Sequence, residues 1–289
     1  MQLDPKFMSY LDHILVCNHH NLSAFRPFTI ENTTVGQLRH ELANKLLTFS
    51  SVFEKLGPTI TLSSGLKDFY TRSEVVGEVV NELVFQGDLP CLTQEQYPVT
   101  TNFTDPPFFQ LDRAVVQHFG IPAYGVHVNG FVQNQVGSLE LWVARRAENR
   151  VLCPGMLDNM VAGGQPIGLG LIENVIKECN EEAAIPKNIA ATAIPVGAIS
   201  YRMETDVGLK SDTMFCFDLE LMANFVPKNR DGEVAEFYRW PIQQVAEIVN
   251  NSYQFKFNCN LVIIDFLIRR GFISPDHPHY LKLIKGLRC

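Results

Sequence analysis

The stretch GGQPIGLGLIENVIKECNEEAAIP, residues 163–186, joins a glycine-rich loop to a helix-forming segment that carries a cluster of glutamates. Because an α-helix turns about 100° per residue, Glu178, Glu181 and Glu182 fall on one face of the expected helix. Like charges three or four residues apart destabilise a helix, so we expect a positive charge between them. A solvated acidic surface is the alternative. The stretch therefore predicts that loop amides and helix carboxylates lie close together.

The composition is that of a globular chain without a basic surface. With 289 residues, 46% of them hydrophobic, the chain can bury a sizeable core in one large domain or two modest ones. A net charge of −7 gives no basic field for nucleic acid. The apolar run 261–268 is interrupted by Asp265 and is too short to span a bilayer, and the first twenty residues do not resemble a secretory signal. Seven scattered cysteines favour reduced thiols, so we expect a cytoplasmic protein without membrane or nucleic-acid partners.

The hydrophobic periodicity changes near residue 118. Before it, helical stripes are expected at 35–49, 75–87 and 112–120, among a few short strands. After it, alternation predicts strands and helical spacing then returns. The expected strands are 123–132, 139–146, 191–203 and 212–221, with a turn at 133–138 between the first two and helices at 243–249 and 260–271. This order predicts an α+β fold in which helices pack against a mixed sheet.

Residues 163–185 resemble the sequence box of the Nudix family, usually written G-x5-E-x7-R-E-U-x-E-E-x-G-U, where U is a bulky apolar residue. The matching positions are Gly163, Lys177 (at the arginine), Glu178, Cys179, Glu181, Glu182 and Ile185. Leu169 replaces the first glutamate of the box and Ala184 its last glycine. Glu173, one turn before Lys177, is a candidate to compensate for Leu169. Similarity covers nearly the whole chain and is strongest from 111 to 276. It includes FGIPAYGVHVNGFV, LWVARR, PGMLDNMVAGG and FKFNCNLVIIDFLIRRGFISPD, which resemble the subgroup related to the extension of fungal thiamine pyrophosphokinase.

The resemblance implies a fold and an activity. Residues 119–289 would form the Nudix α/β/α sandwich with carboxy-terminal helices, preceded by a smaller α+β amino-terminal domain at 1–118. The activity would be metal-dependent hydrolysis of a diphosphate linkage to release a monophosphate, with thiamine diphosphate or its oxo and oxy derivatives as substrate, in metabolite repair. The alternatives are a hydrolase of ADP-ribose or another nucleoside diphosphate derivative, and a Nudix-fold binding or sensor protein with weak catalysis.

The resemblance also implies which residues hold the metal. Glu178, Glu181 and Glu182 would bind Mg²⁺ or Mn²⁺ and act in catalysis. Such hard cations bind carboxylate oxygens, relieve the repulsion between a diphosphate and hydroxide, and acidify water. A further catalytic acid is expected from the loop before the last strand, where we prefer Glu233 to Glu236.

Substrate-binding residues are expected in the glycine loop and the first hairpin, because a thiamine-like ligand needs aromatic faces and cations. The candidates are Gly163, Gly164, Tyr124, His127, Asn129, Trp142, Arg145 and Arg146. Packing within the sheet is the alternative for His127 and Trp142, and a solvated strand end for the two arginines. We expect a small-molecule diphosphate as partner and the amino-terminal domain to frame it; a homodimer is left open.

Overall fold

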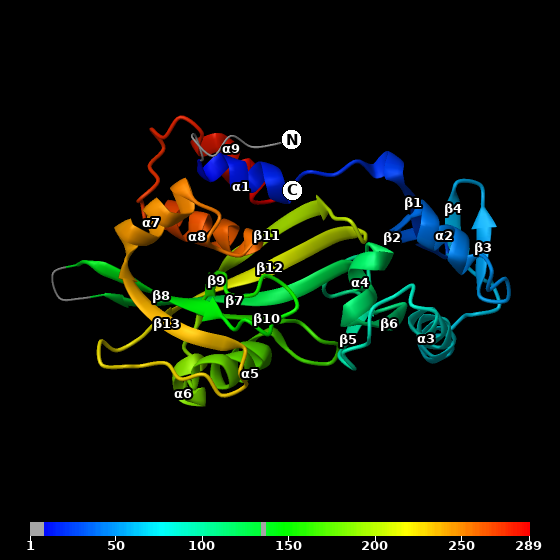
Figure 1. Ribbon diagram of the computed structural model, residues 1–289, viewed down its shortest axis with the longest axis horizontal. Helices are drawn as coiled ribbons and strands as arrows, with labels where there is room; N and C mark the ends of the chain where they lie inside the picture. The colour runs from blue at the N-terminus through cyan, green and yellow to red at the C-terminus, as the bar shows by residue number, and fades with distance from the viewer. Residues whose placement is uncertain (1–8, 134–136) are drawn as a thin grey trace.

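Two bodies lie side by side along the longest axis of the computed structural model, which describes residues 9–133 and 137–289 (Figure 1). The amino-terminal body is formed by residues 22–121. The carboxy-terminal body is formed by residues 122–289 together with the first helix. Each body has apolar clusters of its own, so each has its own core.

The amino-terminal body is a small sheet covered by a long helix. Its four-stranded sheet has the order β2-β1-β4-β3, and a separate pair, β5 and β6, precedes α4. The elements are η2 (Leu22–Ala24), β1 (Phe25–Ile30), β2 (Thr33–Arg39), α2 (His40–Leu46), β3 (Phe53–Leu56), β4 (Thr59–Leu62), α3 (Phe69–Phe85), β5 (Gln96–Val99), β6 (Phe109–Asp112) and α4 (Arg113–Phe119). Phenylalanine rings from strand and helix meet at its centre, around Phe28 and Phe119.

Local signals explain where two of these helices begin and end. Asp68 caps α3 by accepting from the backbone N–H groups of residues 70 and 71, and α3 ends just before Gly87. Gly120 closes α4 in the left-handed conformation (φ 60°) that glycine favours. Both helices confirm their predictions. The helix predicted over 35–49 is wrong in its first half, because residues 33–39 pair with β1 and Gly36 packs against the carbonyl of Phe119, where a side chain would not fit.

The carboxy-terminal body is built on a seven-stranded mixed sheet. Its strand order is β11-β12-β7-β8-β13, with β10 paired to β7 and β9 paired to β8; β12 and β7 are parallel and the other pairs antiparallel. The strands are β7 (Pro122–Gln133), β8 (Leu139–Arg146), β9 (Leu157–Asn159), β10 (Val161–Gly164), β11 (Ile194–Glu204), β12 (Leu209–Glu220) and β13 (Val234–Pro241). The four predicted strands are confirmed. The turn predicted at 133–138 falls in part outside the described residues.

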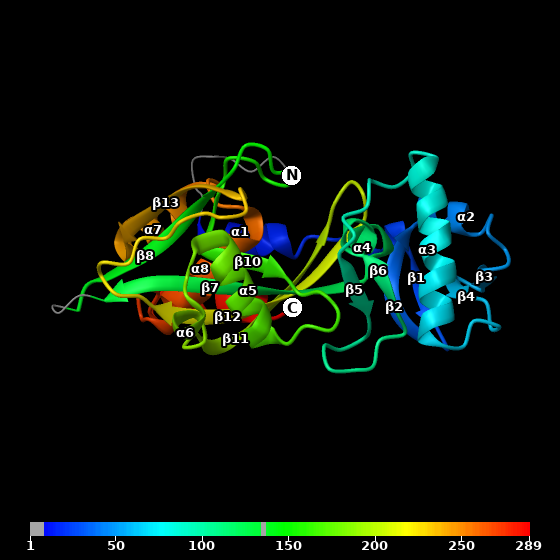
Figure 2. The same ribbon diagram turned by 90° about the horizontal axis from the view of Figure 1, so that it is seen from below.

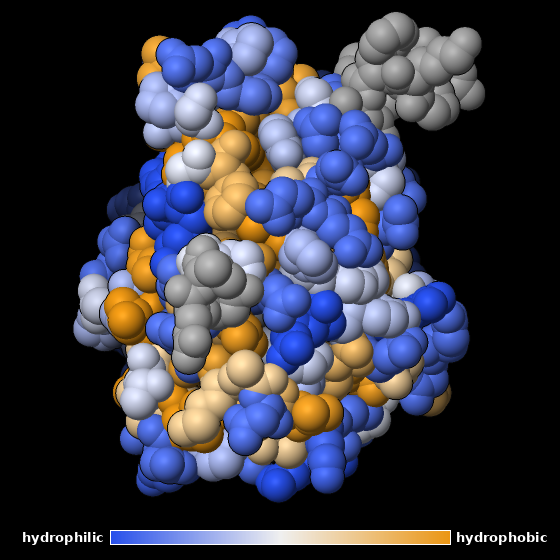
Figure 3. Space-filling model, turned by 90° about the vertical axis from the view of Figure 1, so that its left-hand side faces the viewer, coloured by the Kyte–Doolittle hydropathy of each residue, from blue (hydrophilic) through white to orange (hydrophobic). Residues whose placement is uncertain are grey.

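Helices cover both faces of this sheet, as Figure 1 shows. One face carries α5 (Leu171–Ala183) and α6 (Lys187–Ala190), and the other carries α1 (Tyr10–Cys17), α7 (Ile242–Asn251), α8 (Phe257–Arg269) and α9 (Tyr280–Gly286). The α+β class with a mixed sheet is therefore confirmed. None of the helices within 9–133 and 137–289 has the length and apolar character needed to cross a membrane. At the end of this body far from the amino-terminal body, apolar residues are exposed among hydrophilic ones (Figure 3).

Helix α1 packs with the carboxy-terminal body although it precedes the amino-terminal one. Ile14 and Cys17 are buried in the apolar cluster that contains α8, and the Asn18 side chain donates to the carbonyl of Gly286 (2.8 Å). The chain therefore leaves the carboxy-terminal body after α1 and returns to it after α4. The domain boundary at 118/119 stays a prediction, and α1 is the part of 1–118 that lies in the other body's core.

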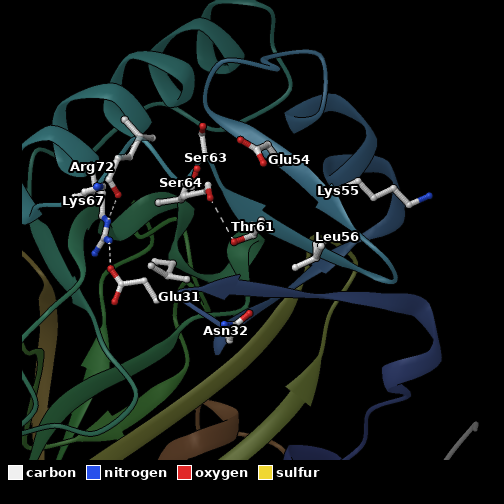
Figure 4. A pocket seen from close by; sticks show the side chains of 13 residues that line it. Glu31, Asn32, Glu54, Lys55, Leu56, Thr61, Ser63, Ser64, Lys67 and Arg72 are labelled. Atoms are coloured by element: carbon white, nitrogen blue, oxygen red, sulfur yellow. Dashed lines mark hydrogen bonds and ion pairs between the residues drawn. The ribbon is translucent and has the colours of Figure 1, made fainter.

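A pocket of about 460 Å³ lies in the amino-terminal body between the β1–β2 turn, β3, β4 and the start of α3 (Figure 4). Arg72 is buried at its edge, where it donates to the carbonyl of Leu66 (2.8 Å) and forms an ion pair with Glu31. None of the predicted site residues lines this pocket. The ion pair between Arg72 and Glu31 therefore connects α3 to the β1–β2 turn.

Candidate active site

Helix α5 presents the glutamate cluster beside β10. Its apolar face packs under the sheet through Val175, Cys179 and Ala183. Glu173 accepts from the backbone N–H of Gly170 (3.0 Å) and so caps the first turn of the helix. The hypothesis that Glu173 compensates for Leu169 by pairing with Lys177 is therefore wrong in this structure, because the carboxylate is used at the cap.

The end of α5 keeps the geometry that the box glycine would give. Ala184 adopts a left-handed conformation (φ 54°), and the N–H of Ile185 donates to the carbonyl of Cys179 (2.9 Å). A non-glycine residue in this conformation costs about 1 kcal/mol. The replacement of glycine by alanine therefore leaves the helix end intact.

The three predicted metal ligands have different surroundings. Glu178 and Glu182 are buried, at 8% and 7% exposure, whereas the Glu181 side chain is 42% exposed. Glu182 accepts from the N–H of Ala162 in β10 (2.9 Å). Lys177 lies 3.0 Å from a Glu178 oxygen and 2.8 Å from a Glu181 oxygen, so the positive charge expected between the glutamates is supplied by the helix itself.

The structure does not gather all three carboxylates into one cluster. Among the described residues, no three His, Cys, Asp or Glu side chains are grouped closely enough to hold a metal ion. The donor chemistry nevertheless fits a hard cation, because the two buried groups offer only carboxylate oxygens. Burial raises the pKa of Glu182 well above its ordinary value, with nearby acids adding to the effect, and burial also raises the pKa of Glu178 against the opposing influence of Lys177. A dication between Glu178 and Glu182 would relieve the repulsion between these two buried groups.

Two adjacent glycines make room for the site. Gly163 and Gly164 lie in β10, paired with residues 126 and 125 of β7. A methyl group on Gly163 would overlap the carboxyl group of Glu178, and one on Gly164 would overlap the hydroxyl of Tyr97. The structure thus gives both glycines a spacing role, while their contact with substrate stays a prediction.

Tyr97 and Arg113 lie beside Gly164, although nothing in the sequence pointed to them. They come from β5 and α4 of the amino-terminal body, which face β10 and α5 in Figures 1 and 2. The N–H of Ile167, in the loop before α5, donates to the carbonyl of Gln96 (2.9 Å). The polar stretch that contains Tyr97 has no periodicity that points to a site, and its partner lies far along the chain.

A second buried charge cluster lies within electrostatic reach of Glu182. Asp158 in β9 accepts from Arg146 (2.8 Å) and lies 3.5 Å from the Lys256 ammonium. The Cys259 thiol also donates to this carboxylate, at 2.6 Å. Burial alone would raise the pKa of Asp158, but Lys256, Cys259 and Arg146 together lower it. Arg146 is therefore an inward-facing ion-pair partner rather than a solvated strand end.

His127 belongs to the same cluster. Its Nδ1 lies 2.8 Å from Oδ1 of Asn159, and the ring is 5% exposed. Burial, helped by the Lys256 charge, lowers the pKa of His127 to about 4, so the imidazole is neutral at pH 7. A neutral ring bonded to Asn159, within electrostatic reach of Asp158 and Lys256, fits a structural role beside this cluster.

The pKa of His127 predicts a pH dependence of stability. Because the native imidazole resists protonation while the unfolded one does not, its contribution is full above about 6.5 and is lost as the pH falls to about 4. We expect His127→Gln to show a shallower loss of melting temperature between pH 6.5 and 4.5 than the wild type. Thermal melts at several pH values check this, and parallel curves for the two proteins would contradict it.

The other predicted substrate residues lie in different surroundings. Trp142 is buried in the apolar cluster under α5, with the Arg239 guanidinium 5.7 Å from its ring. Asn129 donates to Asp218 (3.1 Å), in a buried network with Arg269 on the α8 side. Arg145 is exposed. Tyr124 is buried and packs its ring against Phe103 and Phe215. Their contact with substrate stays a prediction.

Glu233 lies in the loop before β13, as predicted. It pairs with Arg150 (2.7 Å) and is one of the acids that raise the pKa of Glu182. Glu236 instead accepts from the Tyr238 hydroxyl of its own strand (2.6 Å). Of the two acids, Glu233 is the one within electrostatic reach of the buried glutamates.

Comparisons with known proteins cover both bodies. Residues 9–123 match a family model described as a domain of unknown function (DUF4743). Nudix hydrolase 20 and Nudix hydrolase 24 of Arabidopsis thaliana, both named as chloroplastic, are 41% and 40% identical over 290 and 283 residues, which is 96% of this chain and 77% of each relative. An uncharacterized protein of Saccharomyces cerevisiae is 32% identical over 235 residues, 75% of this chain and 68% of the relative.

Solved structures give remoter similarities. A Deinococcus radiodurans protein, DR0079, is 20% identical with a TM-score of 0.45 and covers 62% of this chain and 100% of its own. The NUDIX domain of Shewanella oneidensis NrtR, complexed with ADP ribose, is 13% identical with a TM-score of 0.41 and covers 54% of this chain and 91% of its own.

Proposed function

The chain belongs to the Nudix hydrolase family, and from this premise we propose that its substrate is thiamine diphosphate or an oxidised (oxo or oxy) derivative, from which it releases a monophosphate. Hydrolysis of a diphosphate linkage is the family's chemistry. The observation that supports it best is the pair Glu178 and Glu182, two carboxylates buried beside β10. Keeping two buried acids close together is costly unless a cation joins them.

The chain's own residues divide the work as follows. Glu178 and Glu182 would hold Mg²⁺ or Mn²⁺, with Glu181 joining them once Lys177 turns aside. When bound, such an ion neutralises phosphate oxygens and acidifies water. Glu233, which approaches from the opposite loop, would take the proton from the attacking water. Gly163 keeps the Glu178 carboxyl against the strand.

A second candidate, a Nudix-fold binding or sensor protein with weak catalysis, is favoured by one observation. Lys177 spans Glu178 and Glu181 and so already supplies a positive charge to two of the three carboxylates. A protein whose lysine stayed there would bind a diphosphate without a fully assembled metal site.

One assay separates these candidates. Purified protein is incubated with Mg²⁺ and, in separate reactions, thiamine diphosphate, oxothiamine diphosphate, ADP-ribose and NADH, and the phosphate-containing products are followed. Metal-dependent release of a monophosphate from the thiamine compounds is the expected result. Product from ADP-ribose alone would remove the thiamine assignment and keep the reaction class. Binding without product from any of the four would favour the sensor.

Two further assignments are proposals of the same kind. We retain the division into 1–118 and 119–289 as the division of roles, in which the first part frames the substrate and the second carries the carboxylates. We also retain the cytoplasm as the compartment of this chain. The word chloroplastic belongs to the names of its two plant relatives.

A further inference from the structure

We propose that Arg113, supplied by the amino-terminal body, binds phosphate oxygens of the diphosphate substrate and holds the substrate beside the carboxylates of α5. The proposal rests on the proposed function, because it assigns a binding residue to the same site. Arg113 is the first residue of α4, a helix on the side of the amino-terminal body nearer to β10 (Figure 2). Its guanidinium carbon would lie 3.6 Å from a Cβ atom built on Gly164.

Contacts between the two bodies hold β5 beside β10, and the N–H of Arg113 donates to the carbonyl of Glu95, next to the start of β5 (2.9 Å). The Tyr97 hydroxyl packs against Gly164. A hydrogen bond from the backbone N–H of Ile167 to the carbonyl of Gln96 (2.9 Å) joins the loop before α5 to β5. Tyr97 itself is 6% exposed, so this contact is a dry one. Arg113 is therefore held close to β10, where α5 places its buried glutamates.

Acidic groups of both bodies surround the guanidinium. Its Nη1 lies 2.8 Å from Glu95. Although 48% of the side chain is exposed, partial loss of surrounding water acts to lower the pKa of Arg113; Tyr97, Glu95 and then Glu233 outweigh this effect, so the pKa is raised. Glu233 also acts on Glu182. Glu233 is thus within electrostatic reach of both Arg113 and the buried Glu182.

The chemistry of this cation suits a diphosphate. A guanidinium has five N–H donors in a planar fork that matches two phosphate oxygens, and the bond to Glu95 uses one of them. The Arg113 side chain is 48% exposed, so it remains accessible to a ligand. Three cations near the glutamates already have acidic partners in the site: Lys177 bridges two glutamates, Lys256 is buried against Asp158, and Arg150 pairs with Glu233. Arg113 differs from them because its acidic partner, Glu95, is not one of the predicted catalytic or metal-binding residues.

The test compares Arg113→Met, Arg113→Lys and Glu95→Gln in steady-state hydrolysis by the full chain with Mg²⁺. A substrate-binding role predicts that Arg113→Met raises KM at least tenfold and changes kcat less than about threefold, with Arg113→Lys in between. Glu95→Gln frees the guanidinium, so its KM should stay the same or fall. If Arg113 served only its ion pair with Glu95, both partners' variants would raise KM alike, and that result overturns the proposal.

The control is Lys55→Met, which removes a positive charge from an exposed strand of the same body and should leave KM and kcat unchanged. If the wild type hydrolyses none of the four compounds, the proposed function fails separately from this proposal. The role of Arg113 is then tested by calorimetry, which measures the affinity of the wild type and the variants for imidodiphosphate in the presence of Mg²⁺. Weaker binding by Arg113→Met or Arg113→Lys supports the proposal. Equal binding by wild type and variants overturns it.

Discussion

Glu182→Gln is expected to lower kcat about 10³-fold while KM changes little. The substitution keeps the size of the side chain and the acceptor for the Ala162 N–H, but it removes the negative charge from a buried position on α5. Loss of a charged metal ligand costs several kcal/mol of transition-state stabilisation, and each 1.4 kcal/mol is about tenfold in rate. Steady-state kinetics with saturating Mg²⁺ measure the effect. Retention of more than a tenth of the wild-type kcat would show that Glu182 does not hold the metal.

The same variant should be more stable than the wild type when no divalent cation is present. Burial raises the pKa of Glu182, so the native state binds a proton more tightly than the unfolded state does. Native stability therefore falls as the pH rises above the ordinary glutamate value of 4.5, and glutamine escapes this loss. In EDTA at pH 8 the variant should melt at a higher temperature, by about 2–4 °C for each kcal/mol gained. The difference should shrink at pH 5.

Glu220→Gln is the matched control for both measurements, because Glu220 is exposed at the end of β12. It should leave kcat and the melting temperature near their wild-type values. In the presence of Mg²⁺ the wild type should gain stability by binding the ion, and Glu182→Gln should gain less. Equal gains in the two proteins would place the ion elsewhere.

Gly163→Ala should separate activity from stability. The added methyl group would overlap Cγ and the carboxyl group of Glu178, so this buried side chain would have to turn away while the backbone stays in place. We therefore expect the free energy of unfolding to change by less than about 1 kcal/mol, because no backbone has to move. The displaced carboxylate should lower kcat by about 10²-fold, since misplacing a catalytic group by about 1 Å has effects of this size.

Gly77→Ala is the matched glycine control. Gly77 lies within α3 of the amino-terminal body, and a methyl group there would meet no atom within 4 Å. Alanine should stabilise the helix by about 0.5–1 kcal/mol and leave activity unchanged. Urea unfolding and steady-state kinetics on both variants complete the comparison. Full activity in Gly163→Ala would remove Glu178 from the metal site.

The carboxy-terminal body was largely predictable because its signals are local. Alternation along 123–132 and 139–146 located two strands, and the spacing of the glutamates located α5 and its acidic face. The expected positive charge between the glutamates is Lys177, a neighbour on the same helix. Residues whose partners are a few positions away were therefore anticipated.

Contacts between residues far apart in the sequence were not anticipated. Residues 35–39 have helical spacing, but pairing with β1 makes them part of the strand β2. Glu173 is an exception among the local partners: it has the right spacing for Lys177, but its carboxylate caps the helix at Gly170, only three residues away. The ion cluster around Asp158 and the approach of Tyr97 to Gly164 join distant segments, and nothing in the local sequence around either residue records such a contact.

The path of the chain through α1 limits how the two bodies can move. The amino-terminal body is inserted between α1 and β7, so two segments of the chain connect it to the carboxy-terminal body. A body joined by two linkers can rotate about the line between the linkers. It cannot separate from its neighbour as far as a body joined by one linker could. Trimming the chain from its amino end would also pull Ile14 and Cys17 out of the neighbour's core. Removing the insert cleanly requires joining residue 21 to residue 122 and keeping the first helix.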